Sequence, residues 1–175
     1  MQKPLLAHDR AAAEGALRVL RDKFTGSLFA LYGELALARY DAHPVRLLAL
    51  YDRLLAEFPH ESTWVLSKAA VLRDLHRLPE RLALLEAEGE RLTAEPMVAQ
   101  TLAQALLPNP YRQRDAAMLL RRSVRDRPTA AAGYYLLASQ WWEDRRFDEA
   151  AELYRFACAL DEREDQFADA YFRAA

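Results

Sequence analysis

The sequence repeats itself at an interval of 34 or 35 residues, and this interval constrains the fold more than any other feature. The most regular unit contains Tyr154, and successive steps of 34, 35 and 34 residues toward the N-terminus reach Leu120, Leu85 and Tyr51. A period of this length is typical of units that each comprise one pair of helices. One such pair cannot bury its apolar face alone, so the units must stack on one another and share a continuous core.

Within a unit, the apolar residues follow the period of a helix. Between Tyr134 and Leu160, large side chains recur at spacings of three, four and seven, and the polar segment 143–146 interrupts them. This pattern predicts two helices with one buried face each, joined by a short turn. Six prolines fall between such segments, where proline begins a helix without removing an internal hydrogen bond. They are Pro44, Pro59, Pro79, Pro96, Pro110 and Pro128.

Strong helix formers dominate the composition, whereas β-branched residues are scarce, so we expect an all-α protein. The pair Pro108 and Pro110 is expected to shorten the helix that precedes it. The pattern predicts helices at about residues 9–23, 28–40, 45–58, 62–75, 79–92, 96–107, 112–126, 130–143, 147–160 and 164–175.

The last complete unit resembles the tetratricopeptide repeat, a motif of 34 residues with bulky and small residues at fixed positions. Tyr134, Ala138, Ala150, Tyr154 and Ala157 stand at the fourth, eighth, twentieth, twenty-fourth and twenty-seventh positions. The resemblance implies a right-handed α-solenoid of antiparallel helix pairs. Its divisions would be a capping helix within residues 1–27, then four repeats and the first helix of a fifth repeat, or a terminal cap. These repeats would span 28–61, 62–96, 97–130 and 131–164, and the last helix 165–175.

Charge and cysteine content narrow the range of functions. The chain has 24 basic and 26 acidic residues, and its formal net charge is −2. Proteins that bind nucleic acid usually carry a basic footprint, so we expect no nucleic-acid partner. One cysteine excludes an intrachain disulfide, and the sequence contains no apolar run that would cross a membrane. These features predict a cytoplasmic protein, and the bias toward arginine and alanine favours a bacterial source.

No group of residues in the sequence suggests a catalytic or metal-binding site. His8, His43, His60 and His76 lie far apart, and none has a second ligand three or four residues away, as zinc binding on one helix requires. Cys158 lies on an apolar helix, where a free cysteine usually serves as a small hydrophobic residue. We therefore predict a non-catalytic protein with no metal and no cofactor.

The resemblance also implies where a partner would bind. In this family the first helix of each pair lines a concave groove through its second, fifth, ninth, twelfth and thirteenth positions. We expect the groove to bind a protein or peptide segment that has apolar anchors and a few acidic groups, because tyrosine, tryptophan and arginine often carry binding energy. The alternative for Tyr135 and Trp142 is packing against a neighbouring helix. The predicted groove residues are Tyr32, Arg39, Tyr40, Leu66, Arg73, Thr101, Tyr135, Ser139 and Trp142.

Several functions remain open at this stage. The first is a scaffold or adaptor that recognises a partner segment in the groove. The second is a recognition or regulatory domain of a larger multidomain enzyme. RNA binding is disfavoured by the acidic balance. Self-association is the fourth, because Phe167, Tyr171 and Phe172 resemble the start of a fifth unit without a polar cap.

Overall fold

A computed structural model describes residues 10–24, 27–59, 61–92 and 95–175. These residues form helices joined by short turns, and no strand occurs among them. The chain divides into two compact units, of which the first ends at Arg77 and the second begins at Leu78. Each unit is described by itself below. Parts of the predicted capping region, residues 1–9 and 25–26, lie outside the described residues.

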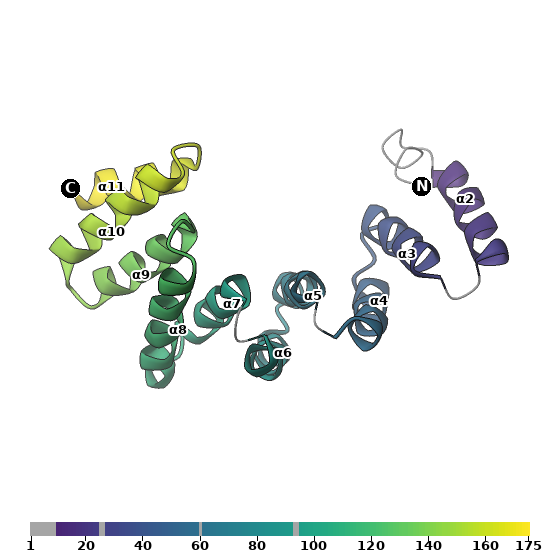
Figure 1. Cartoon of the computed structure of the whole chain (residues 1–175), viewed down its shortest axis with the longest axis horizontal. Helices are drawn as coiled ribbons and strands as arrows, with labels where there is room; N and C mark the ends of the chain where they lie inside the picture. Colours follow the sequence, from purple (N-terminus) through teal and green to yellow (C-terminus); the bar gives the residue numbers. More distant parts are fainter. Residues whose placement is uncertain (1–9, 25–26, 60, 93–94) are drawn as a thin grey trace. The chain divides into compact units, whose positions relative to one another are not determined.

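The described residues of the first unit form four helices that pack in chain order, α2 on α3, α3 on α4 and α4 on α5 (Figure 1). Ser27 begins α3, since its hydroxyl accepts a hydrogen bond of 3.3 Å from the backbone N–H of Ala30. Pro44 begins α4, where its missing N–H costs no helical bond. The helices are α2 (Arg10–Lys23), α3 (Leu28–Tyr40), α4 (Pro44–Glu57) and α5 (Ser62–Asp74).

The core of the first unit lies between α3 and α4. Tyr51 is the largest side chain in it, and Trp64 of α5 packs against the same cluster. Burial of these apolar side chains is the main source of stability, since each removes from water the area that an isolated helix would expose. The buried members are Leu31, Leu35, Ala38, Leu47, Leu50, Tyr51 and Leu54.

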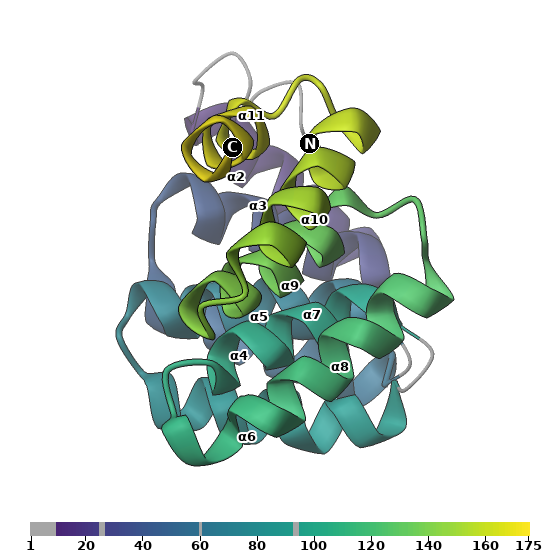
Figure 2. The ribbon, with the colours of Figure 1, turned by 90° about the vertical axis from the view of Figure 1, so that its left-hand side faces the viewer.

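In the second unit, residues 78–92 and 95–175 form six helices and one 3-10 turn. Pairs α7–α8 and α9–α10 pack closely, and α11 packs on α10 (Figure 2). Ala138 of α9 and Ala150 of α10 are completely buried where these helices meet, because a small side chain lets two backbones approach closely. The elements are α6 (Leu78–Arg91), α7 (Pro96–Leu106), η1 (Pro110–Arg112), α8 (Gln113–Asp126), α9 (Ala131–Glu143), α10 (Phe147–Leu160) and α11 (Asp165–Ala174).

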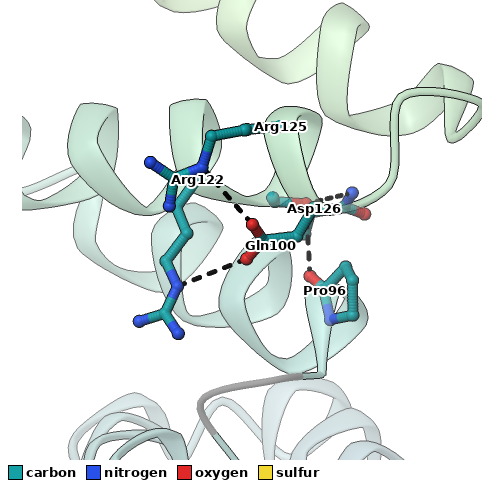
Figure 3. Close-up of polar contacts among 6 residues, drawn as sticks. Pro96, Gln100, Arg122, Arg125 and Asp126 are labelled. Carbon is teal, nitrogen blue, oxygen red and sulfur yellow. Dashed lines mark hydrogen bonds and ion pairs between the residues drawn. The ribbon is translucent and has the colours of Figure 1, made fainter.

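A buried polar contact joins α7 to α8 (Figure 3). Gln100 Nε2 donates a hydrogen bond of 2.7 Å to Ser123 Oγ, and the Ser123 hydroxyl lies 3.4 Å from the carbonyl oxygen of Pro96. Asp126, one turn further along α8, pairs with Arg122 and Arg125 at 3.4 Å each. Ser123 is therefore engaged with α7, and Asp126 with two arginines of its own helix.

The helices predicted from the sequence are confirmed, and their ends differ from the predictions by one residue at most. The predicted shortening of the helix before Pro108 is also confirmed, since α7 ends at Leu106. The sequence did not predict the 3-10 turn η1. It forms because Asn109 Oδ1 accepts a hydrogen bond of 3.0 Å from the backbone N–H of Tyr111. The division into four repeats stays a prediction.

Candidate functional site

A cavity of about 390 Å³ lies among α9, α10 and α11 in the second unit. Two aromatic residues come from α9 and one from α10, whereas α11 contributes an amide, a guanidinium group and two alanines. Figure 1 shows these three helices side by side. The lining residues are Tyr135, Trp142, Tyr154, Gln166, Ala170, Arg173 and Ala174.

Tyr135 lies where all three helices meet. Its ring centroid is 5.7 Å from that of Tyr154 and 5.2 Å from that of Phe167, a buried residue of α11. Its hydroxyl oxygen accepts a hydrogen bond of 2.7 Å from Gln166 Nε2. Tyr135 therefore lines the cavity and also holds α11 in place.

Trp142 forms another part of the wall, one residue before α9 ends. Its ring meets that of Phe147 edge to face, with 4.8 Å between the centroids. This geometry is favourable because the positive edge of one ring approaches the negative face of the other. Phe147 is 47% exposed and Trp142 is half-buried, so the contact orients Trp142 without enclosing it.

Tyr154 contributes a hydroxyl group with a fixed orientation. It donates a hydrogen bond of 3.1 Å to Ser139 Oγ, and the Ser139 hydroxyl donates one of 2.9 Å to the carbonyl oxygen of Tyr135. Burial raises the pKa of the Tyr154 phenol, because the phenolate would lose hydration, and the bond to Ser139 opposes this shift. Tyr154 is therefore neutral at physiological pH and presents a largely apolar ring.

Among the described residues that line this cavity, Arg173 alone is charged, and its side chain is 80% exposed. Its guanidinium group lies 3.6 Å from Asp169, which is 67% exposed. An exposed pair at this distance contributes little stability, so a ligand carboxylate can compete for the same guanidinium group. The site thus combines aromatic walls with a cationic rim.

The first unit holds two of the other predicted groove residues in defined contacts. Tyr32 lies 5.6 Å from Trp64 between ring centroids and is 39% exposed. Arg39 donates hydrogen bonds of 2.7 and 3.2 Å to the hydroxyl oxygen of Tyr51, and its guanidinium carbon is 5.9 Å from the Tyr51 ring centroid. The Arg39 guanidinium group is therefore engaged within its own unit.

The structure does not bring the remaining four predicted residues to the cavity. Tyr40 is 41% exposed and Leu66 is half-buried, both in the first unit. Arg73 pairs with its neighbour Asp74 at 2.9 Å. The Thr101 hydroxyl donates a hydrogen bond of 2.8 Å to the carbonyl oxygen of Met97 on its own helix.

Gln166 and Arg173 line the cavity but were not among the predicted groove residues. A signal for them existed: if the fifth unit begins at residue 165, they occupy its second and ninth positions, which face the groove in the family that the chain resembles. Residues 165–175 were predicted to be the first helix of a fifth repeat or a terminal cap, but the groove positions of the family were not assigned to them. Of the two aromatic residues near the end of that helix, Tyr171 is half-buried and Phe172 is 75% exposed.

Residues that could bind a metal ion do not gather at one place among the residues that the structure describes. No three histidine, cysteine or acidic side chains there are placed to hold a metal ion. Cys158 is half-buried and packs against the cluster of Ala131, Ala157 and Phe167. Within the same part of the chain, no helix has both the length and the apolar character needed to cross a membrane.

No protein-family model matches the chain, and no curated protein sequence does so either. Solved structures are similar to it in three dimensions. Pseudomonas aeruginosa PilF is 16% identical with a TM-score of 0.74, over 99% of this chain and 79% of that chain. A thermophilic TPR (tetratricopeptide-repeat) protein of Thermus thermophilus is 14% identical with a TM-score of 0.68, over 98% and 93%.

A third similar structure is that of YrrB, described as a TPR protein with an unusual peptide-binding site. It is 12% identical to this chain with a TM-score of 0.66, and the match covers 97% of this chain and 87% of that one. Likenesses at these identities establish the fold. The chain has the all-α solenoid fold of tetratricopeptide-repeat proteins.

Proposed function

We propose that this chain is a non-catalytic protein–protein interaction scaffold that binds a segment of a partner protein in the cavity among α9, α10 and α11. The observation that carries the proposal is the composition of that cavity. Tyr135, Trp142 and Tyr154 line it, and Arg173 stands exposed at its rim. A volume of about 390 Å³ lies within the range of about 300–1,000 Å³ that is usual for ligand pockets.

The lining residues favour a particular partner chemistry. An apolar side chain inserted against the three aromatic rings would be removed from water, which is the main gain in most protein associations. Tyrosine, tryptophan and arginine are the residues on which such binding energy usually depends. A carboxylate beside the inserted side chain would meet Arg173. The partner segment therefore has an apolar anchor next to an acidic residue.

The similar proteins agree with this proposal at the level of the fold. YrrB is described as having a peptide-binding site, and TPR folds present helix surfaces built for such contacts. The cytoplasmic location and bacterial source that the composition favours belong to the proposal as well. If the chain serves a larger enzyme as its recognition domain, the same cavity binds the substrate protein or a regulatory segment.

Site-specific photo-crosslinking tests the proposal. A benzoylphenylalanine replaces Gln166 at the cavity rim in one variant and Phe172, an exposed aromatic residue outside the cavity lining, in the other. Both variants are irradiated in cells of the source organism, and the crosslinked peptides are sequenced by mass spectrometry. We expect a defined segment with an apolar and an acidic residue at position 166 alone. The same set of crosslinks from both positions would contradict the proposal.

A further inference from the structure

A second cavity of the same unit lies between α8 and α9 and shares no lining residue with the first. Its volume is about 570 Å³. Because α8 and α9 belong to one compact unit and pack on each other, the two walls are fixed relative to one another. The residues that line this second cavity include Arg114, Met118, Arg121, Gln140, Trp141 and Asp144.

Two arginines of this cavity have no partner within the described part of the chain. Arg114 and Arg121 are exposed, and neither makes a hydrogen bond or ion pair with any residue that the structure describes. In contrast, two arginines nearby in the sequence are paired. Arg112 pairs with Asp115, and Arg122 pairs with Asp126. An arginine side chain has five donors in a planar fork, which suits a carboxylate. Arg114 and Arg121 are thus available to anions.

The distance between these two arginines determines how far apart two anionic groups of one ligand must lie to contact both. They are seven residues apart on one helix, so they lie on the same face, about 10.5 Å apart along the helix axis. In an extended peptide of the polyproline II type, which has three residues per turn, residues three apart lie on the same side and are separated by about 9 Å. Two acidic residues at that spacing would each meet one arginine.

Apolar surface lies beside the arginines. Met118, one turn from each of them, is 61% exposed, and Trp141 of α9 is half-buried. The Arg146 guanidinium carbon lies 4.2 Å from the Trp141 ring centroid and covers one face of that ring. An apolar side chain between two acidic residues would contact Met118 and Trp141.

A buried acceptor in the lining distinguishes an extended segment from a helix. Gln140 is 9% exposed, and its Nε2 donates a hydrogen bond of 3.3 Å to the carbonyl oxygen of Gln113. Its Oε1 accepts no hydrogen bond from the residues that the structure describes. A buried acceptor without a partner is costly. Gln140 Oε1 is enclosed, so the amide must turn toward the cavity before a ligand can donate to it. An extended peptide has free backbone N–H groups for this purpose, whereas those inside a helix are already paired.

We infer that this second cavity is a docking site for an extended acidic peptide whose two carboxylates lie three residues apart, with an apolar side chain between them. The charges favour a peptide over a nucleic acid. Asp144 lines the same cavity and repels a continuous row of phosphates, and the chain as a whole has a net charge of −2. The Asp144 carboxylate would also repel a third acidic residue of the peptide near the turn between α9 and α10.

The experiment measures fluorescence anisotropy of the intact chain with the labelled peptide Gly-Ser-Glu-Leu-Ala-Glu-Ser-Gly. Two further probes replace both glutamates by glutamine, or place them side by side. We expect binding of the first probe, with a Kd about five- to tenfold lower than for either other probe, as the loss of two exposed ion pairs implies. Equal binding of the three probes, or no binding, would overturn the proposal.

Variants of the chain test the same site. The double change Arg114→Gln with Arg121→Gln should raise the Kd of the first probe about fivefold or more, as expected for two exposed ion pairs. The control is the double change Arg18→Gln with Arg163→Gln, at two exposed positions outside the cavity. It changes the net charge by the same amount and should leave the Kd of the first probe within about twofold. Equal effects of the two double changes would overturn the proposal.

One variant has the opposite expected sign. Asp144→Asn removes the single acidic group of the cavity and should lower the Kd about twofold, since like charges at an exposed site repel weakly. A rise in Kd with unchanged helix content would overturn the proposal, because it would mean that Asp144 attracts the ligand instead of repelling it. A single-stranded oligonucleotide of eight nucleotides serves as the last probe. Tighter binding of the oligonucleotide than of the peptide would assign the site to nucleic acid instead.

Discussion

Gln100 donates a hydrogen bond of 2.7 Å to Ser123 in a place where both side chains are almost completely buried, at 3% and 1% exposure. The bond links α7 to α8, and Gly133 of α9 lies against it. Three helices of the second unit therefore meet around one polar contact (Figure 3). In such a place a hydrogen bond costs more to break than it contributes when formed, because the remaining partner stays buried and unpaired.

Ser123→Ala should lower the free energy of unfolding by about 1–3 kcal/mol, because it leaves the Gln100 amide without its acceptor. Urea unfolding followed by circular dichroism measures this loss. Thr101→Ala is the control, since the Thr101 hydroxyl is bonded only to the backbone of its own helix and should cost under about 0.5 kcal/mol. Equal losses for the two variants would show that the buried bond has no special role.

Two glycines give opposite predictions for the same substitution. A Cβ at Gly133 would lie 3.0 Å from Gln100 Nε2 and 3.1 Å from Val124 Cγ2, whereas nothing lies within 4 Å of a Cβ at Gly15 in α2. Gly133→Ala should therefore destabilise the chain by about 1–3 kcal/mol through crowding. Gly15→Ala should stabilise it by about 0.5–1 kcal/mol, because alanine loses less backbone entropy in a helix. Thermal unfolding of both variants decides, and stabilisation by Gly133→Ala would contradict the packing.

The accuracy of the helix predictions has a physical origin. Proline cannot occupy a helix interior, and apolar side chains with a period near 3.6 must face a common core, so both ends and faces follow from local chemistry. Pro44 and Pro96 begin helices in the structure as this argument requires. The turn at Pro110 was missed because it depends on the rotamer of one side chain, Asn109, which no periodicity encodes.

Acidification should weaken the first unit through the pair Arg10–Asp41, which joins α2 to the end of α3 at 2.7 Å. The hydrogen bond from Arg10 lowers the pKa of Asp41 below its usual 3.8. A lowered pKa means that this contribution to stability is complete above the usual value and is lost as the pH falls through the folded value. The difference in unfolding midpoint between the wild type and Asp41→Asn should be constant from about pH 7 to about pH 5, and should shrink toward about pH 3.

A difference that stays the same over this whole range, or grows on acidification, would contradict the assignment of the pair. Glu14 also contacts Arg10, at 2.7 Å, so Glu14→Gln in both backgrounds isolates the part that belongs to Asp41.

The hydroxyl of Tyr51 should contribute measurably to the first unit, because it accepts two hydrogen bonds from Arg39 while its ring is 2% exposed. Tyr51→Phe keeps the ring and removes only the acceptor, so the expected loss is about 0.5–1.5 kcal/mol of unfolding free energy. Tyr111→Phe is the matched control, since Tyr111 is 94% exposed and its loss should not be detectable. Chemical denaturation of the two variants compares them, and an equal effect would show that the Arg39 contact is inert.

The candidate site was only partly predictable, and Arg39 shows why. The resemblance to a repeat family assigns Arg39 to the groove by its position, but position alone does not reveal that a tyrosine hydroxyl on the next helix lies within 2.7 Å. Hydrogen bonds depend on side-chain conformations at the scale of an ångström, which a repeat period does not set. Tyr135 and Trp142 were assigned to the groove by their repeat positions as well, and in the structure both line the cavity, where bulky aromatic side chains fill the space that the helix spacing leaves.

The central claim is that a partner segment binds between α9, α10 and α11. Its most direct test is the Kd of the segment crosslinked at position 166, made as a synthetic peptide and titrated against three chains of equal helix content: the wild type, Trp142→Ala and Phe172→Ala. Loss of a central anchor typically costs about 2 kcal/mol, so Trp142→Ala should raise the Kd about thirtyfold. Phe172→Ala, which removes an exposed aromatic residue outside the cavity lining, should leave the Kd within about twofold. Equal Kd values for the two variants would contradict the account.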